Sequence, residues 1–173
     1  MMVIFDAKSD DINRYNWKGD LKDLTGEDIT KFIGEWKAGN IYKHLISTER
    51  PDVDTIDGLT SIVGSSWHEI ILDPSKDKIV LYYGEWCPHC KSLMPVWEEL
   101  AKYYEGSDSL VVGRLEAETN EIDGAVILKY PTIRFYDKDY NIVNKKVHEY
   151  AGHKTLEDFK KYIIERSSAI QET

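Results

Sequence analysis

Both cysteines of the chain lie where an expected strand passes directly into an expected helix. Residues 78–83 are mostly apolar and aromatic, which predicts a buried strand. Residues 88–104 follow with apolar side chains at helical spacing, and Cys87 and Cys90 stand at the start of that helix. Pro95 lies inside it, so we expect a kink there and not a stop. This junction favours an α/β domain.

Strands and helices alternate on both sides of the junction. We expect strands at 59–63, 110–116, 132–136 and 144–149, and helices at 65–72, 118–128 and 155–166. Crossover connections predict a largely parallel sheet, and the last two strands predict an antiparallel hairpin at one edge. The expected fold class is therefore α/β, with a mixed central sheet flanked by helices.

The first part of the chain follows a separate pattern. Residues 2–6 are expected to form a strand, and Thr25 followed by Asp28 is a capping-box variant that begins a helix over 26–38. A strand and one amphipathic helix cannot bury their own apolar faces, which indicates part of a second domain. A helical extension packed on the main domain is the alternative. We expect a partial domain at 1–46, a charged linker at 47–58, the main domain at 59–168 and a tail at 169–173.

Composition and charge exclude several classes of function. The 173 residues carry a formal net charge of −9 at pH 7, so no cationic excess exists to bind the phosphates of a nucleic acid. No apolar run approaches the roughly 18–20 residues of a membrane span, and the opening run is too short for a signal peptide. We expect a soluble, monomeric protein that binds neither nucleic acid nor membrane.

The sequence Cys87-Pro88-His89-Cys90 favours redox chemistry. A disulfide that closes so short a loop removes little chain entropy, so the pair is not a structural staple. Thiolate is the attacking form of cysteine, and the start of a helix favours an anion, which makes Cys87 the expected nucleophile. Cys90, one turn further in, is the expected resolving thiol. His89 can add positive charge or a hydrogen bond beside Cys87, and Pro88 suits the first helical turn.

Metal binding is the competing use of a C-x-x-C motif. Structural zinc needs four ligands, and the chain has no second cysteine pair. The remaining histidines are scattered: His44, His68, His148 and His153. The acidic run lacks the ordered spacing of a calcium loop and is interpreted as solvated charge at a helix start: Glu116, Glu118, Glu121 and Asp123. We expect no metal and no dissociable cofactor, only a redox-active disulfide between Cys87 and Cys90.

Two motifs carry a resemblance to a known family. The segment Tyr82-Tyr83-Gly84-Glu85-Trp86-Cys87-Pro88-His89-Cys90-Lys91 resembles F-Y-A-P-W-C-G-H-C-K of the protein disulfide isomerase family, and Tyr130-Pro131-Thr132 resembles its second hallmark. The resemblance spans about 59–168 and implies a thioredoxin-like fold. It also implies that Pro131 is cis, faces the dithiol and contacts substrate together with Tyr130 and Trp86. Residues 1–46 resemble the end of the preceding, redox-inactive third domain, so that the chain would be the C-terminal part of a longer isomerase.

The resemblance implies an enzyme, a thiol–disulfide oxidoreductase and isomerase acting in the endoplasmic reticulum lumen. Its partners would be unfolded or misfolded proteins with thiols or disulfides, and glutathione or a thiol oxidase. The closing residues 169–173 are not a retention signal. Two alternatives stay open: a peptide-binding chaperone module in which redox activity is secondary, and a thioredoxin-type general reductant with a much lower reduction potential.

Three positions depart from the family pattern. Pro88 replaces the usual glycine, giving the C-P-H-C sequence also found in strongly oxidising thiol oxidases. Leu81 replaces a buried glutamate, while the basic residue that usually partners it survives as Arg114. Leu128 replaces a mobile arginine, with only Lys129 beside it. We therefore expect a site biased towards oxidation, in which mixed disulfides with substrate are resolved slowly.

Overall fold

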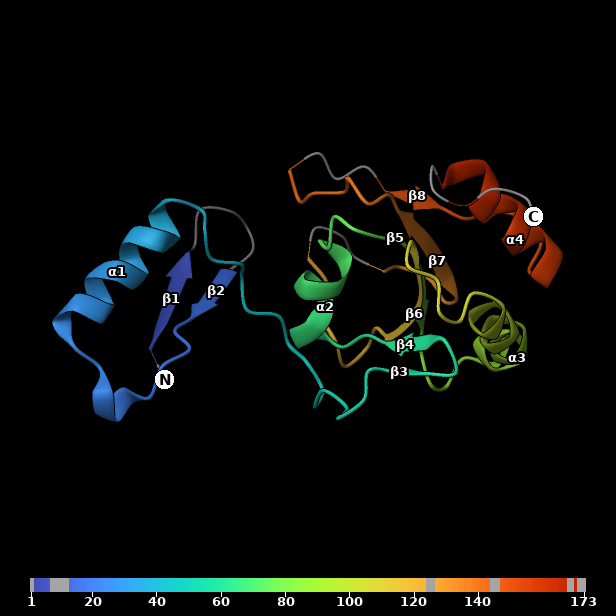
Figure 1. Cartoon of the computed structure of the whole chain (residues 1–173). Coiled ribbons are helices and arrows are strands. Elements are labelled where there is room, and N and C mark those ends of the chain that lie inside the picture. Colours follow the sequence, from blue (N-terminus) through green and yellow to red (C-terminus); the bar gives the residue numbers. More distant parts are fainter. Residues whose placement is uncertain (1, 7–12, 124–126, 144–146, 168–169, 171–173) are drawn as a thin grey trace. The chain divides into compact units, whose positions relative to one another are not determined.

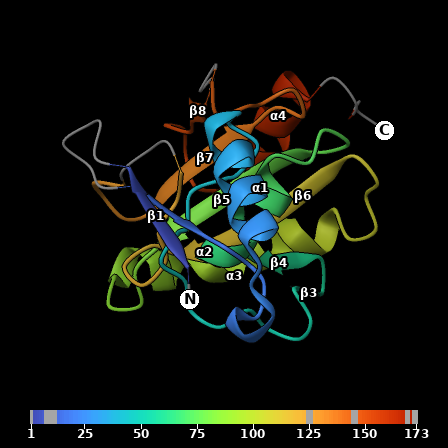
Figure 2. The same cartoon turned by 90° about the vertical axis from the view of Figure 1, so that its left-hand side faces the viewer.

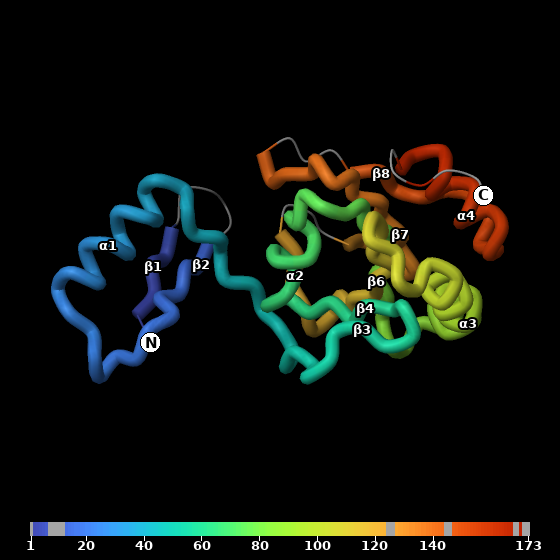
Figure 3. The backbone as a smooth tube through the Cα atoms, viewed as in Figure 1, coloured from blue at the N-terminus to red at the C-terminus, as the bar shows by residue number. Residues whose placement is uncertain are grey.

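The computed structural model describes residues 2–6, 13–123, 127–143, 147–167 and 170. The chain divides into two compact units, Met1–Leu45 and Ile46–Thr173. Each unit has a sheet of its own, two-stranded in the first and six-stranded in the second. Figure 3 traces the backbone through both units.

The first unit combines a hairpin with a helix. Strand β1 (Val3–Asp6) pairs antiparallel with β2 (Asn13–Asn16), and a short 3-10 helix at Leu21–Asp23 precedes α1 (Gly26–Lys37). The capping box is present: the backbone N–H of Asp28 donates to Thr25 Oγ1 at 3.2 Å, and that of Thr25 donates to Asp28 Oδ2 at 2.9 Å. The predicted first strand and helix of this unit are confirmed.

The second unit is built on a mixed sheet (Figure 1). Its strands are β3 (Thr55–Ile56), β4 (Leu59–Ser61), β5 (Asp77–Tyr83), β6 (Leu110–Glu116), β7 (Thr132–Tyr136) and β8 (His148–Glu149). Their order in space is β3-β4-β6-β5-β7-β8. Strands β4, β6 and β5 are parallel, and β7, β8 and β3 each pair antiparallel with a neighbour. The predicted mixed sheet is confirmed, although residues 144–146 of the predicted last strand lie outside the described residues.

Helices cover both faces of this sheet. Helix α2 (Gly64–Ile71) lies on one face, and α3 (Pro88–Tyr103) and α4 (Leu156–Arg166) lie on the other (Figure 1); Figure 2 looks towards the α2 face. Helix α3 continues through Pro95 without a stop, as predicted. The core between β5 and the α3 and α4 face includes Ile79, Leu81, Leu93, Trp97 and Phe159. Strand β5, which leads to the dithiol, is therefore held from both sides.

The described part of segment 118–128, predicted as a helix, forms a turn and coil instead. Residues 124–126 of that segment lie outside the described residues. The carboxylate of Glu116 accepts the backbone N–H groups of Glu118 at 3.3 Å and of Thr119 at 2.9 Å. A side chain that binds these donors gives the backbone an alternative to helical hydrogen bonds. The turn keeps Glu118 close to the end of β6.

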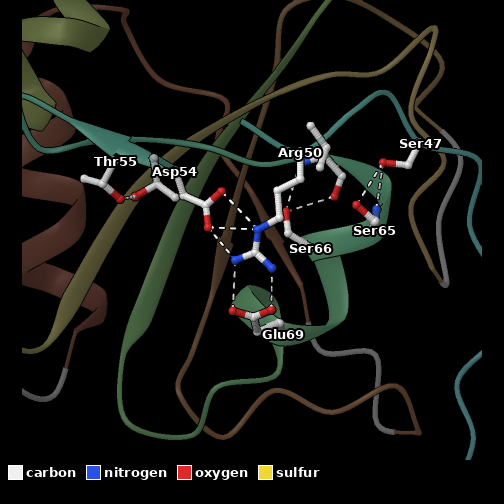
Figure 4. A network of polar contacts seen from close by, with 9 residues as sticks. Ser47, Arg50, Asp54, Thr55, Ser65, Ser66 and Glu69 are labelled. Carbon is white, nitrogen blue, oxygen red and sulfur yellow. Dashed lines mark hydrogen bonds and ion pairs between the residues drawn. The ribbon is translucent and has the colours of Figure 1, made fainter. Parts of the chain in front are cut away.

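Residues 47–58, predicted as a linker, pack against the second unit (Figure 4). Ser47 Oγ accepts a backbone N–H from the first turn of α2 at 2.9 Å. Arg50 Nη1 donates to Glu69 Oε2 on α2 at 2.7 Å. Thr55–Ile56 add the edge strand β3 to the sheet. The polar side chains of this segment therefore bind the surface of the second unit.

No helix in the described part of the chain is long and apolar enough to cross a membrane. Among the same residues, no three histidine, cysteine, aspartate or glutamate side chains gather in a way that could hold a metal ion.

Candidate active site

Cys87 and Cys90 lie where β5 passes into α3. Cys87 is the N-cap of α3, and its Sγ accepts the backbone N–H of Cys90 at 3.2 Å. The Cys90 thiol donates to the same sulfur, with the two Sγ atoms 2.6 Å apart. Both cysteines are free thiols. Two donors and the amides of the first helical turn favour negative charge on the Cys87 sulfur, which is what a nucleophilic role requires.

The two thiols are similarly buried, and the surroundings of Cys90 disfavour its thiolate form. Cys87 is 3% exposed and Cys90 is 1% exposed, so both are buried. Burial and the hydrogen bond to Cys87 raise the pKa of the Cys90 thiol to about 11. Cys90 is therefore protonated at neutral pH and must lose its proton before it can attack a disulfide.

Pro88 and His89 occupy the first two positions of α3, and both are exposed. A proline has no N–H to leave unpaired in the first turn, so Pro88 costs this helix no hydrogen bond. The backbone N–H of Lys91 donates to the carbonyl of Cys87 at 3.1 Å, which closes that first turn. His89 thus stands on a fixed turn between the two cysteines, open to solvent.

An aromatic wall, formed by the side chains of Trp86 and Tyr130, stands beside the dithiol. The rings meet edge to face with centroids 6.2 Å apart, and Trp86 is 63% exposed. The peptide bond between Tyr130 and Pro131 is cis, as the family resemblance implied. Strand pairing sets Thr132 opposite Tyr82, so Tyr130 and Pro131 lie beside the end of β5. The structure therefore brings the expected substrate-contacting residues together at the carboxyl end of β5.

Glu118 also belongs to this site, and the sequence analysis missed it. Its Oε1 accepts the indole N–H of Trp86 at 2.6 Å. The interpretation of the acidic run as simply solvated was wrong, because Glu121 accepts the Ile46 backbone N–H at 2.8 Å and Asp123 lies 2.9 Å from a ring nitrogen of His68. Nothing in the sequence marks an acidic residue so distant in the chain as the partner of Trp86.

Leu81 and Arg114 lie opposite each other on the parallel strands β5 and β6. Leu81 is fully buried in the core. Arg114 is partly exposed, with Nη1 3.8 Å from Met94 Sδ and 3.9 Å from Glu98 Oε1, both on α3. The Arg114 side chain thus extends along α3. Its register partner on β5, Leu81, has no carboxylate that could pair with it.

The position of the family's mobile arginine is apolar and exposed. Leu128 is 90% exposed, and Lys129 Nζ lies 3.1 Å from Glu149 Oε1 on β8. The loop before the cis bond therefore exposes Leu128 to solvent, and the ammonium group of Lys129 is paired with Glu149 on the edge strand β8.

A cavity of about 470 Å³ opens beside Cys90. Its lining residues are Tyr83, Gly84, Glu85, Cys90, Lys91, Met94 and Arg114. Burial raises the pKa of Tyr83, an effect that the charge of Arg114 opposes. Among the lining residues Glu85 carries the carboxylate. Cys90 and the Glu85 carboxylate thus line the same cavity.

Fold and site together define a thioredoxin-like α/β domain with a dithiol at the start of a helix. The thioredoxin family model matches residues 58–165, and the chain belongs to the thioredoxin family. Within it, the chain is similar to the protein disulfide isomerase of Gallus gallus, at 31% identity over 147 residues, covering 85% of this chain and 28% of the relative. The isomerase of Drosophila melanogaster is 30% identical over 162 residues, covering 91% of this chain and 32% of the relative.

A solved structure shows the same fold. The first thioredoxin domain of mouse protein disulfide-isomerase A4 superposes with a TM-score of 0.56 at 20% identity, covering 73% of this chain and 89% of that one. The expected thioredoxin-like fold is confirmed. The domain has relatives among the protein disulfide isomerases at about 30% identity over most of this chain, in line with the resemblance in the sequence. The chain spans 28 to 32% of the length of the two isomerases, so it matches only part of each.

Proposed function

We propose that the chain is a thiol–disulfide oxidoreductase and isomerase acting through Cys87 and Cys90. One observation supports this above all: the N-cap sulfur of Cys87 receives hydrogen bonds from both the backbone and the thiol of Cys90. A sulfur so placed is suited to carry negative charge, to attack a disulfide and to leave again as thiolate. The family to which the chain belongs contains enzymes named for this reaction.

The reaction is an exchange of sulfur–sulfur bonds. The Cys87 thiolate attacks one sulfur of a substrate disulfide, forming a mixed disulfide and releasing the other substrate sulfur as thiolate. Cys90 then loses its proton and attacks Cys87 Sγ. The Cys87–Cys90 bond forms, the mixed disulfide breaks, and the substrate leaves with two electrons and its second thiolate. The reverse sequence transfers two electrons from substrate thiols to the Cys87–Cys90 disulfide, which is thereby reduced. Glutathione disulfide or a thiol oxidase then oxidises the two cysteines again.

The second step is the slow one in this proposal. The pKa of Cys90, raised to about 11 by burial, leaves a small thiolate fraction at neutral pH. Leu81 on β5 cannot accept the proton. A long-lived mixed disulfide gives a second thiol of the same substrate time to attack, which rearranges the bond and frees Cys87 without net oxidation. Slow resolution therefore favours isomerisation.

The substrates would be unfolded or misfolded proteins with thiols or disulfides. The protein would act in the endoplasmic reticulum lumen. An exposed aromatic wall beside the sulfur suits extended chains with apolar side chains. A lumen poised near the potential of such enzymes supports exchange in both directions. We propose that residues 1–46 are part of a redox-inactive domain of the same kind.

A peptide-binding chaperone module is the second candidate, and the exposure of Trp86 favours it. Insulin reduction and suppression of client aggregation, each measured for the unchanged chain, Cys87→Ser and Cys90→Ser, separate the two. An oxidoreductase loses insulin reduction in Cys87→Ser, and Cys90→Ser accumulates mixed disulfides with the substrate. If Cys87→Ser reduces insulin as fast as the unchanged chain, the oxidoreductase proposal fails. Aggregation suppression without any insulin reduction in the unchanged chain would support the chaperone module instead.

A further inference from the structure

Glu118 holds the exposed Trp86 by a contact that reaches across two segments of the chain. The indole N–H of Trp86 donates to Glu118 Oε1 at 2.6 Å. Glu118 is itself fixed, because its backbone N–H donates to Glu116 and the preceding N–H of Ala117 donates to the carbonyl of Tyr83 at 2.9 Å. The acceptor of the indole is therefore tied to the end of β5, the strand that carries the dithiol.

Gly84 and Tyr130 also lie beside the indole. Trp86 and Tyr130 meet edge to face, and both rings lie over Gly84. A Cβ atom at Gly84 would lie 3.2 Å from Trp86 Nε1 and 3.3 Å from Tyr130 Cδ2, closer than ordinary contact. Glu118 and Tyr130 therefore both contact the indole, although most of its surface faces solvent.

We infer that Glu118 is a positioning residue that presets the aromatic wall for peptide substrates. The inference rests on the proposed function and deepens it. The substrate class is an extended peptide with an aromatic or large aliphatic residue next to its reactive cysteine. A wall already ordered in the free protein spares the cost of immobilising an exposed side chain on binding.

The test compares Glu118→Leu and Glu118→Gln, with Glu99→Leu on the exposed side of α3 as a matched control. Glutamine keeps a carbonyl acceptor for the indole but removes the charge, whereas leucine removes the acceptor. We expect Glu118→Leu to raise KM roughly three- to tenfold for a disulfide-linked peptide with phenylalanine beside its cysteine, with kcat retained. Glu118→Gln and Glu99→Leu should keep the original KM. The urea midpoint of each variant verifies that it has folded, and Glu99→Leu should keep the original rate with 2-hydroxyethyl disulfide.

A spectroscopic measurement tests the same contact directly. The indole N–H resonance of Trp86, assigned by its loss in Trp86→Phe, should move upfield in Glu118→Leu and stay nearly in place in Glu118→Gln. An unchanged peptide KM in Glu118→Leu, with the small-disulfide rate intact, overturns the inference and leaves the proposed function standing. If the unchanged chain exchanges neither the peptide nor the small disulfide, the proposed function fails and the inference fails with it. A KM change of equal size in Glu118→Gln would assign the effect to charge and would also overturn it.

Discussion

Leu81 and Arg114 are register partners on adjacent parallel strands, one fully buried and the other reaching to the edge of α3. A carboxylate at Leu81 would lie within the same layer as the guanidinium and beneath the dithiol helix. In its place stands an alkyl side chain packed in the core with Leu93 and Trp97. Position 81 of the strand that leads to the reactive sulfur therefore provides shape and rigidity but no proton acceptor.

Leu81→Glu should shorten the lifetime of a mixed disulfide between Cys87 and a peptide at least about tenfold, because a nearby general base accelerates loss of the Cys90 proton. Acid-quenched samples analysed by mass spectrometry measure that lifetime. Leu81→Gln is the matched control, since it has the same size without a basic carboxylate, and it should resolve as slowly as the unchanged chain. Equal lifetimes in all three chains would remove the argument for slow resolution.

His89→Ala should make the disulfide a weaker oxidant. The imidazole is expected to stabilise the Cys87 thiolate, so its loss destabilises the reduced form. A tenfold change in the exchange constant with glutathione corresponds to a fall of about 30 mV in the reduction potential of the Cys87–Cys90 pair. Lys102→Ala, at the far end of the same helix, removes a cation without touching the dithiol and should leave the potential in place. A potential unchanged by the loss of His89 would assign the histidine no part in tuning the site.

Asn120→Ala should destabilise the second unit by about 2–3 kcal/mol. The buried amide accepts backbone N–H groups from Thr48 at 3.0 Å and Gly64 at 2.9 Å, so its loss leaves two donors unpaired. Arg50→Met should cost less than about 1 kcal/mol, because its ion pair with Glu69 is exposed to solvent. Urea denaturation with an unchanged m-value measures both. A greater loss from Arg50 than from Asn120 would contradict this ranking.

Lys78→Met should change how stability depends on pH. Lys78 is buried and donates to the carbonyl of Asp73, and burial lowers its pKa to about 8. In the unfolded chain the pKa is about 10.4, so between pH 8 and pH 10 the unfolded state binds more protons and this lysine makes stability rise with pH. The unfolding free energy of the unchanged chain, minus that of Lys78→Met, should therefore increase by about 2 kcal/mol between pH 8 and pH 10. Parallel pH profiles for the two chains would contradict the expectation.

The local part of the site could be predicted from the sequence. An apolar strand, a helix-start proline and two cysteines in one short stretch fix the N-cap position of Cys87 without long-range information. The reciprocal bonds of Thr25 and Asp28 were predictable for the same reason, because a capping box is complete within four residues.

Features that depend on distant partners were missed. Asp57 and Gly58, with φ of 49° and 79°, make the turn between β3 and β4, and Asp-Gly is a recognised hairpin signal that the charged surroundings obscured. Strand β2 is polar and lacks the alternation that predicts a strand. The partner of Trp86 is set by a turn after β6, and no pattern in the sequence specifies which acidic residue of that turn reaches the indole.

The most direct test of the central claim is a redox titration of Cys87 and Cys90 against glutathione, read out by alkylation and mass spectrometry. We expect a single two-electron transition with a midpoint above about −230 mV, in the range of enzymes that donate disulfides. A midpoint at or below about −270 mV would instead identify a thioredoxin-type reductant. No transition across the accessible glutathione ratios would contradict a redox-active dithiol altogether.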